Sequence, residues 1–422
     1  MWVVAYFNRL WRPALLHGWL AFAAGSLGAA ACACAATSVP VQANLGGMAA
    51  ASFVRVPEDH PTIQAAVDAA PDGGVVLIAP GVYHEEVRIA GKSVRLASHF
   101  LTTRDPRYIE TTVLGGSIPA PADAEDDDDV RRNQVILVEA DAGPRTAIVG
   151  LTIRDGDDGI SCHARIAILF NLFLNNSDAI DYEDGGGECR FNRFIANDDD
   201  AVDYDGACDG LCANNLIHAN DDDGIEIRFQ PYRGEEMYLV IRDNVITNNG
   251  EDGIQIVDYP GMSDRRVTIE RNLIAGNAMA GIGFMGDANT RENYEGAPVP
   301  EPVTIVNNTL VGNYYGITGG ASVQVVNNVI VRHLRAGMKN IAGKSTITHN
   351  LLWQNGEAPS GCRLGEGVLW EEDPRLDDEH RPRAGSPCLD AGTLLIDALD
   401  VTAVSPQQFR GRAPDLGAFE IR

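Results

Sequence analysis

The sequence repeats a short motif, Asn-x-apolar-x-x-Asn, at intervals of 20 to 36 residues. Seven complete copies run from NLFLNN to NLLWQN, and a degraded copy, NVIVRH, precedes the last of them. Copies commonly follow a run in which apolar and polar residues alternate, such as VTIERN or VTIVNN. This alternation is typical of β-strands with one buried and one exposed face. The copies start at Asn171, Asn192, Asn215, Asn244, Asn272, Asn308, Asn328 and Asn350.

These short strands constrain the fold, because a strand of a few residues cannot bury an apolar face alone and must stack on a neighbouring copy. The pattern predicts an all-β fold, a parallel β-helix built as a solenoid of short three-strand coils. The aligned asparagines would then form hydrogen-bonded side-chain ladders. Helical solenoids are excluded, because no ten-residue run has a 3.6-residue period. The longer repeats contain the insertions PYRGEEM, YPGMSDRR and GDANTRENYEGAPVPE, which we expect to leave the stack as loops.

The charge balance excludes some classes of function. The chain carries 59 acidic and 33 basic residues, a formal net charge of −26. Nucleic acid is excluded as a partner, because binding phosphates requires clustered Lys and Arg. Apolar residues make up 45% of the chain, which favours a globular protein over a disordered one.

The first residues have the features of an export signal. Arg9 and Arg12 precede the apolar run LLHGWLAFAAGSLGAAA, which ends among small residues. Cleavage after Ala35 and a lipoprotein-type site at Cys32 both remain open, so the mature protein is expected in the periplasm, at the cell surface or outside the cell. No later segment is apolar enough to span a membrane. The expected divisions are a signal over 1–36, a linker over 37–54, the β-helix over 55–356 and a tail over 357–422.

Six cysteines remain after the signal, and an even number in an exported chain favours disulfides over metal ligation. Cys189 and Cys212 each lie three residues before a repeat asparagine, so they are expected in one column of adjacent coils and form a predicted disulfide. The pairings Cys162–Cys208 and Cys362–Cys388 would complete one of the fifteen ways to pair six cysteines.

The two ends of the chain resemble a known family. VPEDHPTIQAAVDAAPDGGVVLIAPGVYHEEVRIAGKSVRLAS, residues 56–98, is similar to the N-terminal cap and first coils of right-handed parallel β-helix proteins of the pectin-lyase-like superfamily. DPRL, GSPCLDAG and DLGAFE, near the C-terminus, resemble the irregular tail of exported bacterial members. The resemblance implies a right-handed helix and contact with a polysaccharide. It leaves the reaction open, because the fold hosts lyases, hydrolases, esterases, epimerases and non-catalytic adhesins.

Acidic residues recur in register on four successive copies, NSDAIDYED, NDDDAVDYD, NDDDGIEIR and NGEDGIQIV. Ile180, Val202, Ile225 and Ile254 are expected to point inward, so the next residue of each copy points outward. The outward positions are Asp181, Asp203, Glu226 and Gln255, followed two residues later by Glu183, Asp205 and Arg228. A further column, in the turn before each strand, contains Asp178, Asp200, Asp223 and Asp252.

Such columns predict a cation site. Adjacent parallel strands lie about 4.8 Å apart, where two unit charges repel by roughly 3 kcal/mol at an effective dielectric constant near 20. The carboxyls must therefore hold protons, with raised pKa values, or hold cations between them. Ca²⁺ suits such a set of oxygen ligands, and its predicted ligands are Asp181, Asp203, Asp205, Asp223, Glu226 and Asp252. The alternative is a solvated acidic surface with ordinary Asp-Gly turns.

A lyase is the leading hypothesis for an enzyme. Ca²⁺ would neutralise a uronate carboxylate and acidify the C5 proton, and the resemblance implies Arg or Lys as the base. Arg228 is the basic residue that projects from the predicted columns, although a salt bridge to Asp205 or Glu226 would explain it equally well. His218, Tyr232 and Arg233 are nearby candidates for proton transfer or substrate contact. An epimerase would use the same proton abstraction.

A hydrolase is the second hypothesis. NSDAID and DDAVD are similar to the first two catalytic motifs of polygalacturonase-type inverting hydrolases, which implies Asp178, Asp199 and Asp200 as the acid and base carboxyls. The chain departs from that family at its third motif, Gly-His-Gly, where DDDG stands at 221–224, and it lacks Arg-Ile-Lys. GVYHE at 81–85 matches an early motif of pectin methylesterases, but their later motifs have no counterpart.

A non-catalytic surface protein that binds ions for rigidity and glycan through its loops is the rival class. In every case the expected partner is a polysaccharide, bound through Ca²⁺ if it is anionic, because a chain of net charge −26 repels a polyuronate. We expect a monomer.

Overall fold

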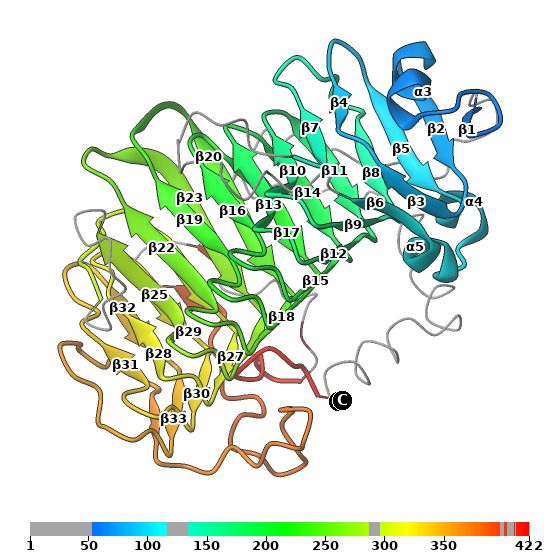
Figure 1. The fold of residues 1–422 in the computed structure, drawn as a ribbon. Coiled ribbons are helices and arrows are strands. Elements are labelled where there is room, and N and C mark those ends of the chain that lie inside the picture. The colour runs from blue at the N-terminus through cyan, green and yellow to red at the C-terminus, as the bar shows by residue number, and fades with distance from the viewer. Residues whose placement is uncertain are drawn as a thin grey trace, which may run out of the picture.

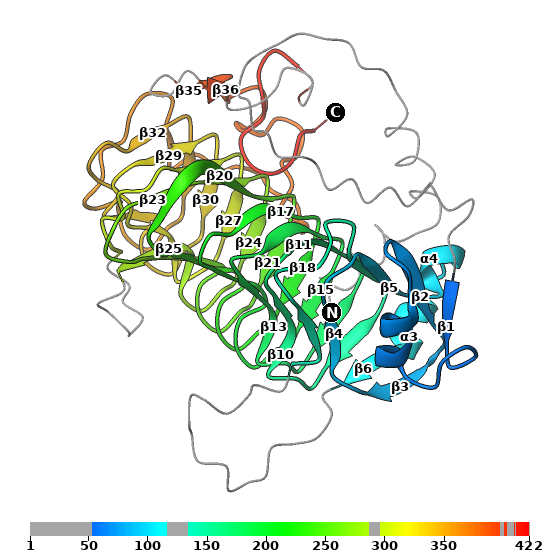
Figure 2. The same cartoon turned by 90° about the horizontal axis from the view of Figure 1, so that it is seen from above.

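The computed structural model describes residues 53–115, 134–286, 296–396, 401–402, 409 and 411–421. The predicted signal, its cleavage sites and most of the predicted linker lie outside these residues. Three long parallel sheets wind around one axis as a solenoid, which confirms the predicted β-helix (Figures 1 and 2). Along the chain, each coil contributes one strand to sheet A, then one to sheet B, then one to sheet C.

The strands of each sheet pair in parallel with those of the neighbouring coils. Sheet A contains β1 (Phe53–Val56), β2 (Gly74–Ile78), β5 (Val94–Ser98), β8 (Ala147–Val149), β11 (Arg165–Leu169), β14 (Gly186–Arg190), β17 (Asp209–Ala213), β20 (Tyr232–Arg242), β23 (Ser263–Glu270), β26 (Val303–Val306), β29 (Val323–Val326) and β32 (Thr346–Thr348). Sheet B contains β3 (Gly81–His84), β6 (Thr112–Gly115), β9 (Thr152–Arg154), β12 (Leu172–Leu174), β15 (Arg193–Ile195), β18 (Leu216–His218), β21 (Val245–Thr247), β24 (Leu273–Ala275), β27 (Thr309–Val311), β30 (Val329–Val331), β33 (Leu351–Trp353) and β34 (Leu369–Trp370). Sheet C contains β4 (Val87–Ile89), β7 (Ile136–Val138), β10 (Asp158–Cys162), β13 (Asp178–Glu183), β16 (Asp203–Asp205), β19 (Glu226–Phe229), β22 (Ile254–Asp258), β25 (Ala280–Gly286), β28 (Tyr315–Thr318) and β31 (Met338–Lys339).

The repeat asparagines form two hydrogen-bonded ladders, as predicted. The first asparagine of each copy lies at the turn into sheet B, where Asn171 Nδ2 donates to Asn192 Oδ1 at 3.2 Å, and the pattern continues to Asn350. The second lies at the turn into sheet C, where Asn176 Nδ2 donates to Asn197 Oδ1 at 3.0 Å, and this ladder continues to Asn313. Buried amides that satisfy one another fix the stacking register.

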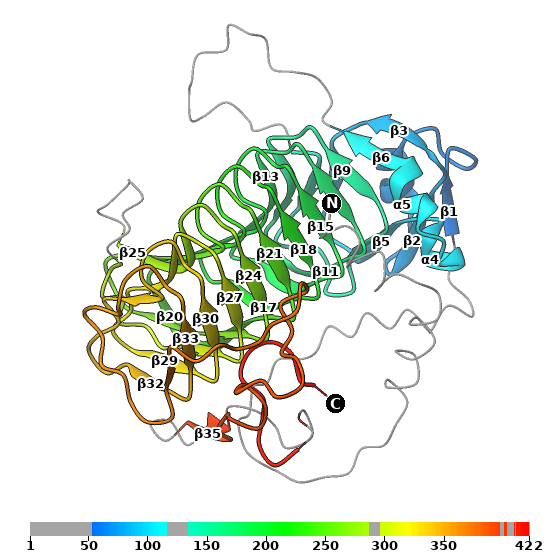
Figure 3. The same ribbon diagram turned by 90° about the horizontal axis from the view of Figure 1, so that it is seen from below.

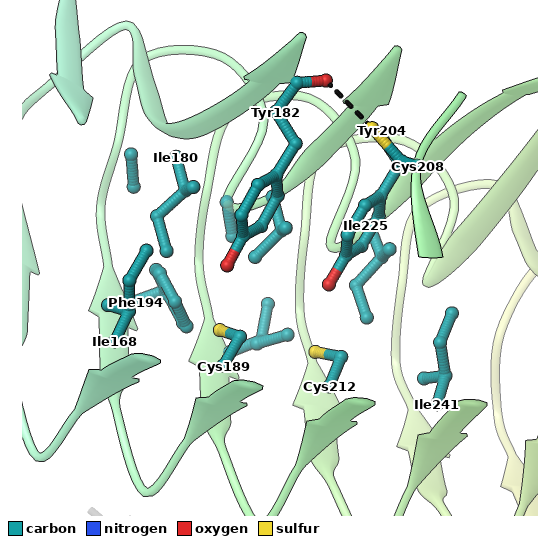
Figure 4. Packing of buried hydrophobic residues seen from close by; sticks show 14 of the residues in the cluster. Ile168, Ile180, Tyr182, Cys189, Phe194, Tyr204, Cys208, Cys212, Ile225 and Ile241 are labelled. Atoms are coloured by element: carbon teal, nitrogen blue, oxygen red, sulfur yellow. Dashed lines mark hydrogen bonds between the residues drawn. The ribbon is translucent and has the colours of Figure 1, made fainter. Parts of the chain in front are cut away.

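The solenoid interior is filled by the inward side chains of all three sheets. Tyr182 and Tyr204, predicted as stacked core aromatics, lie parallel with ring centroids 4.9 Å apart (Figure 4). On the same two coils, Gly187 and Gly210 occupy inward positions of sheet A, in register with the buried Ile166 and Leu239. A Cβ at Gly187 would collide with the carbonyl oxygen of Ile166, so the close approach of these two coils requires glycine at this position.

The predicted disulfides are absent, because the six cysteines of the described residues are free thiols. Cys189 and Cys212 do share one column, as predicted, on β14 and β17 (Figure 4). Strands in register hold their Cβ atoms near the strand spacing of about 4.8 Å, which exceeds the roughly 3.5–4.5 Å that a disulfide requires. Cys208 Sγ instead contacts the carbonyl oxygens of Tyr182 and Asp205, at 3.2 and 2.7 Å.

Short elements close the two ends of the solenoid. Helix α3 (Ile63–Ala69) covers the first coils, and the Glu85 carboxylate accepts the amides of Ile63 and Gln64. Helices α4 (Phe100–Thr103) and α5 (Arg107–Thr111) pack beside β5 and β6, and β35 (Leu395–Ile396) pairs antiparallel with β36 (Val401–Thr402).

The tail then returns along the solenoid (Figure 3), where Asn307 Nδ2 donates to the Asp415 carbonyl at 2.9 Å. Within the described part of the chain, no helix is both long and apolar enough to cross a membrane.

Candidate functional site

The outer face of sheet C carries the predicted acidic columns in the predicted register. Asp181 pairs with Asp203, Asp203 with Glu226, and Glu226 with Gln255, along β13, β16, β19 and β22. These four residues are only 3–7% exposed, although their side chains point outward. We call this surface, together with the acidic turns that lead into it, the acidic wall. Its acidic residues are Asp178, Asp181, Asp199, Asp200, Asp203, Asp205, Asp222, Asp223, Glu226, Glu251 and Asp252.

The turn column forms a ladder of its own. The backbone amide of Asp200 donates to Asp178 Oδ1 at 3.2 Å, and that of Asp223 donates to Asp200 Oδ1 at 2.9 Å. Asp223 and Asp252 continue the ladder, and Asp252 Oδ1 accepts the amide of Ala280. One oxygen of each carboxyl is thus used to hold the next coil, which leaves the other oxygen for a different partner.

Arg228 is the counterion of the wall. Its guanidinium lies 3.2 Å from Asp203 Oδ2, 3.1 Å from Asp205 Oδ2 and 2.6 Å from Glu226 Oε2. Burial by itself would lower the pKa of Arg228, but the three carboxylates raise it above its ordinary value. A base must lose its proton, so this environment opposes the role of base predicted for Arg228 and supports the alternative, a salt bridge.

Several carboxyls of the wall resist ionisation. Burial raises the pKa of Asp178 to about 7 and that of Asp181 to about 8, with further contributions from the charges of neighbouring aspartates. Burial and the charge of Glu251 raise the pKa of Asp222 to about 6. Burial and neighbouring charges also raise the pKa values of Asp200, Asp203 and Asp223 well above the ordinary range. Without a cation, the wall therefore retains several protons at neutral pH.

Three groups of carboxyls, among the described residues, bring one oxygen each to within 4.8 Å of one another. The donors are carboxylate oxygens throughout, which are the ligands that Ca²⁺ prefers. Asp203 Oδ1 is also buried without a hydrogen-bond partner, so the chemistry of the wall fits a cation. The first triad is Asp199, Asp200 and Asp222; the second is Asp200, Asp203 and Glu226; the third is Asp222, Asp223 and Glu251.

Only some of the predicted Ca²⁺ ligands belong to the triads. Asp203, Asp223 and Glu226 belong to them, whereas Asp181, Asp205 and Asp252 do not. Asp199 and Asp200, predicted as catalytic carboxyls, are triad members, and Asp178 is adjacent to them. Asp222 and Glu251 were not predicted as ligands, because the predicted turn column contains only one acidic residue from each turn. The acidic runs NDDDG and NGEDG indicate both residues, since the residue before the turn aspartate is acidic in each run.

The three predicted substrate contacts lie on sheets A and B and belong to none of the triads. Tyr232 and Arg233 begin β20 in sheet A, where Arg233 pairs with Asp264 at 3.0 Å. His218 ends β18 in sheet B, with Nδ1 3.0 Å from Thr247 Oγ1. Tyr259, which was not predicted, follows β22. Burial raises its pKa, and the charge of Arg228 opposes this shift. The alternation of strands cannot predict this position, because Tyr259 lies in a loop.

Comparison with known proteins defines the class. The profile of the family described as "Right handed beta helix region" matches residues 134–295. The protein is therefore a right-handed parallel β-helix, as the resemblance implied.

A similar solved structure is that of pectate lyase Pel9A, with 16% identity and a TM-score of 0.53 over 85% of this chain and 91% of that one. The catalytic domain of a GH87 α-1,3-glucanase in complex with nigerose has 13% identity and a TM-score of 0.48, over 75% of this chain and 68% of that one. The Azotobacter vinelandii mannuronan C-5 epimerase AlgE4 A-module has 14% identity and a TM-score of 0.34, over 74% and 92%. No curated protein sequence matches this chain.

Proposed function

We propose that this chain is an exported, Ca²⁺-dependent lyase that acts on an acidic polysaccharide. The observation that carries the proposal is the first triad, in which Asp199, Asp200 and Asp222 converge on the outer face of the solenoid. The same fold in a pectate lyase supports a polysaccharide substrate. The net charge of −26 supports a bridging cation, because the bare protein would repel a polyuronate.

The first triad is a better cation site than the second. Two members of the second triad, Asp203 and Glu226, already pair with Arg228 at 3.2 and 2.6 Å. Asp200 belongs to both triads and links them.

The residues of this chain would have separate roles in the proposed lyase reaction. Bound Ca²⁺ would supply positive charge that offsets the uronate carboxylate and so acidifies the proton at C5. Asp178 lies on the coil before the triad, where its Oδ1 accepts the amide of Asp200, and we assign it as the acceptor of that proton. The C4–O bond would then break as the C4–C5 double bond forms, and the departing oxygen would take a proton from water. Arg228 holds Asp203, Asp205 and Glu226 in place beside the reacting sugar.

The test is a digest of polygalacturonate, alginate and other polyuronates by the mature protein, with Ca²⁺ and with EDTA. We expect ultraviolet-absorbing unsaturated products with Ca²⁺ only. Asp199→Asn and Asp222→Asn should each lower Ca²⁺ affinity and activity at least tenfold, since each removes a charged ligand. The matched control is Asp264→Asn, because Asp264 pairs with Arg233 in sheet A. Ca²⁺ binding without turnover of any polymer would contradict the lyase and favour a non-catalytic binder.

A second candidate is an inverting glycoside hydrolase. It is favoured by the position of Asp178 beside Asp199 and Asp200, and by the pKa of Asp178, which burial and the charge of Asp199 raise to about 7. Such a carboxyl retains its proton near neutral pH and can donate it to a leaving group. New reducing ends without ultraviolet absorbance, formed equally in EDTA, would favour this candidate.

A further inference from the structure

A histidine extends the acidic wall by one coil. The residue after β10 is His163, one position beyond the register pair Cys162–Tyr182, which places it beside Glu183 of β13. Glu183 pairs in turn with Asp205 of β16. One outward column therefore reads His163, Glu183 and Asp205, with Arg228 on the next coil bonded to Asp205 at 3.1 Å.

One contact holds the imidazole of His163 and another holds its backbone. Its Nε2 lies 3.5 Å from the Oγ of Ser161, which is fully buried beneath it. Its backbone amide donates to the carbonyl oxygen of Val138 at 2.8 Å. We assign the Ser161 hydroxyl as the donor to Nε2, which makes Nδ1 the donor atom of the ring.

The other side of the ring is open to a ligand. Nδ1 lies 3.8 Å from Glu183 Oε2, beyond hydrogen-bond distance. The side chains of His163 and Glu183 are 31% and 49% exposed, so a ligand can reach both. An oxygen placed between them would be within about 2.9 Å of each group, the ordinary length of such a bond. A hydroxyl fits this position, because it can accept from Nδ1–H and donate to the carboxylate at once.

We propose that His163 and Glu183 form a sugar-binding subsite that recognises a hydroxyl group; the substrate assigned to it rests on the proposed function. A carboxylate is disfavoured here because it would face the charge of Glu183. The subsite therefore discriminates between sugar positions: one sugar presents its carboxylate to the first triad, and a neighbouring sugar presents a hydroxyl to His163 and Glu183.

The distance between coils determines which sugar of the polysaccharide binds to His163 and Glu183. His163 lies on β10, two coils before β16 and its acidic turn, a separation of about 10 Å at the spacing of adjacent strands. This is too far for contact with the sugar whose carboxylate lies at the triad. The triad lies where the strands of sheet C begin and the subsite lies where they end, so the polysaccharide would cross the outer face of sheet C obliquely to the solenoid axis.

The experiment compares His163→Gln, Glu183→Gln and the double variant on defined oligouronates, with Ca²⁺. We expect each single variant to raise KM about tenfold, with kcat within about twofold, since hydroxyl binding precedes the chemistry. The double variant should raise KM no further than either single variant, because both groups bind the same hydroxyl. The matched control is His60→Gln, a half-buried histidine in the N-terminal region before α3, which should leave KM unchanged.

Three measurements separate the outcomes. Calorimetric titration with Ca²⁺ should give the same affinity for wild type and His163→Gln, because the imidazole belongs to no triad. Unchanged KM in both single variants, or additive effects in the double variant, would overturn the subsite while leaving the lyase intact. If wild type converts no polyuronate, the proposed function fails instead. Calorimetric binding of the same oligouronates then decides the subsite, which requires weaker binding in both variants than in wild type.

Discussion

At the scale of the residue, the acidic wall depends on Arg228. Three carboxylates within 3.2 Å surround its guanidinium, and Asp203 is 4% exposed. A buried carboxylate without a partner destabilises the fold. Removal of one member of a buried ion pair is therefore strongly destabilising, because it leaves the other charge buried and uncompensated. Arg228 thus neutralises part of the wall, and the contacts that favour its protonated form oppose the role of base predicted for it.

Replacement of Arg228 by Gln should lower the free energy of unfolding by about 3 kcal/mol at pH 7 in EDTA, because Asp203, Asp205 and Glu226 lose their counterion. Added Ca²⁺ should restore part of the loss by binding the carboxylates. The matched control is Arg242→Gln, whose side chain is 32% exposed, like that of Arg228 at 33%, but whose ion pairs are 3.9 and 4.0 Å long; it should cost less than about 1 kcal/mol. Urea denaturation checks both, and equal losses would contradict the role of Arg228.

At the scale of the element, the asparagine ladders hold the coils in register, and one ladder has a defect. The ladder at the turn into sheet C runs from Asn176 to Asn313. The next position is His333, in the degraded repeat NVIVRH, and its backbone amide donates to Asn355 Oδ1 at 3.1 Å. His333 is 2% exposed, and burial lowers its pKa to about 4. An imidazole cannot reproduce the paired donor and acceptor of an amide.

His333→Asn should restore the ladder and raise the free energy of unfolding by about 1 kcal/mol at pH 7, the net value of a hydrogen bond. The gain should increase to about 3 kcal/mol at pH 5. A folded pKa near 4 means that wild type loses stability as pH falls from the ordinary value of 6.5 towards 4, by about 2 kcal/mol at pH 5, whereas asparagine does not titrate. Urea denaturation at both pH values measures this, and a pH-independent difference would contradict it.

At the scale of the whole molecule, folding concentrates negative charge on one face of an already acidic chain. The pKa values of about 7 for Asp178 and about 8 for Asp181 are raised above the ordinary value of 3.8. Groups of this kind stabilise the fold fully below pH 3.8, and their contribution is lost as pH rises through 7 and 8. Protons and cations are thus alternative ways to neutralise the wall.

The melting temperature in EDTA should therefore fall between pH 6 and pH 8.5, as the wall loses its protons. Ca²⁺ should raise it more at pH 8.5 than at pH 6, because a ligand that binds the folded state stabilises it and protons compete for the same oxygens. Differential scanning calorimetry with and without Ca²⁺ checks the expectation. Mg²⁺, which prefers a smaller octahedral site, is the control ion. An effect of Ca²⁺ that is larger at pH 6 would contradict the prediction.

Much of the fold was predictable from local pattern. The spacing of Asn171, Asn192 and Asn215 predicted the coils, and alternation predicted that Tyr182 and Tyr204 point inward; both are confirmed. The disulfides were not predictable in this way, because a shared column places cysteines side by side without bringing their Cβ atoms close enough to bond.

The sequence by itself determined the solenoid and the acidic columns, because a residue that recurs once per coil must stack on its counterpart when the strands pair in register. Only the tertiary structure decided the use of each carboxyl. Whether Asp181, Asp199 or Asp222 binds a cation depends on which oxygens converge in the turns and which ones Arg228 already occupies. Those are distances between coils twenty or more residues apart, and the position of a residue within its own repeat contains no information about them.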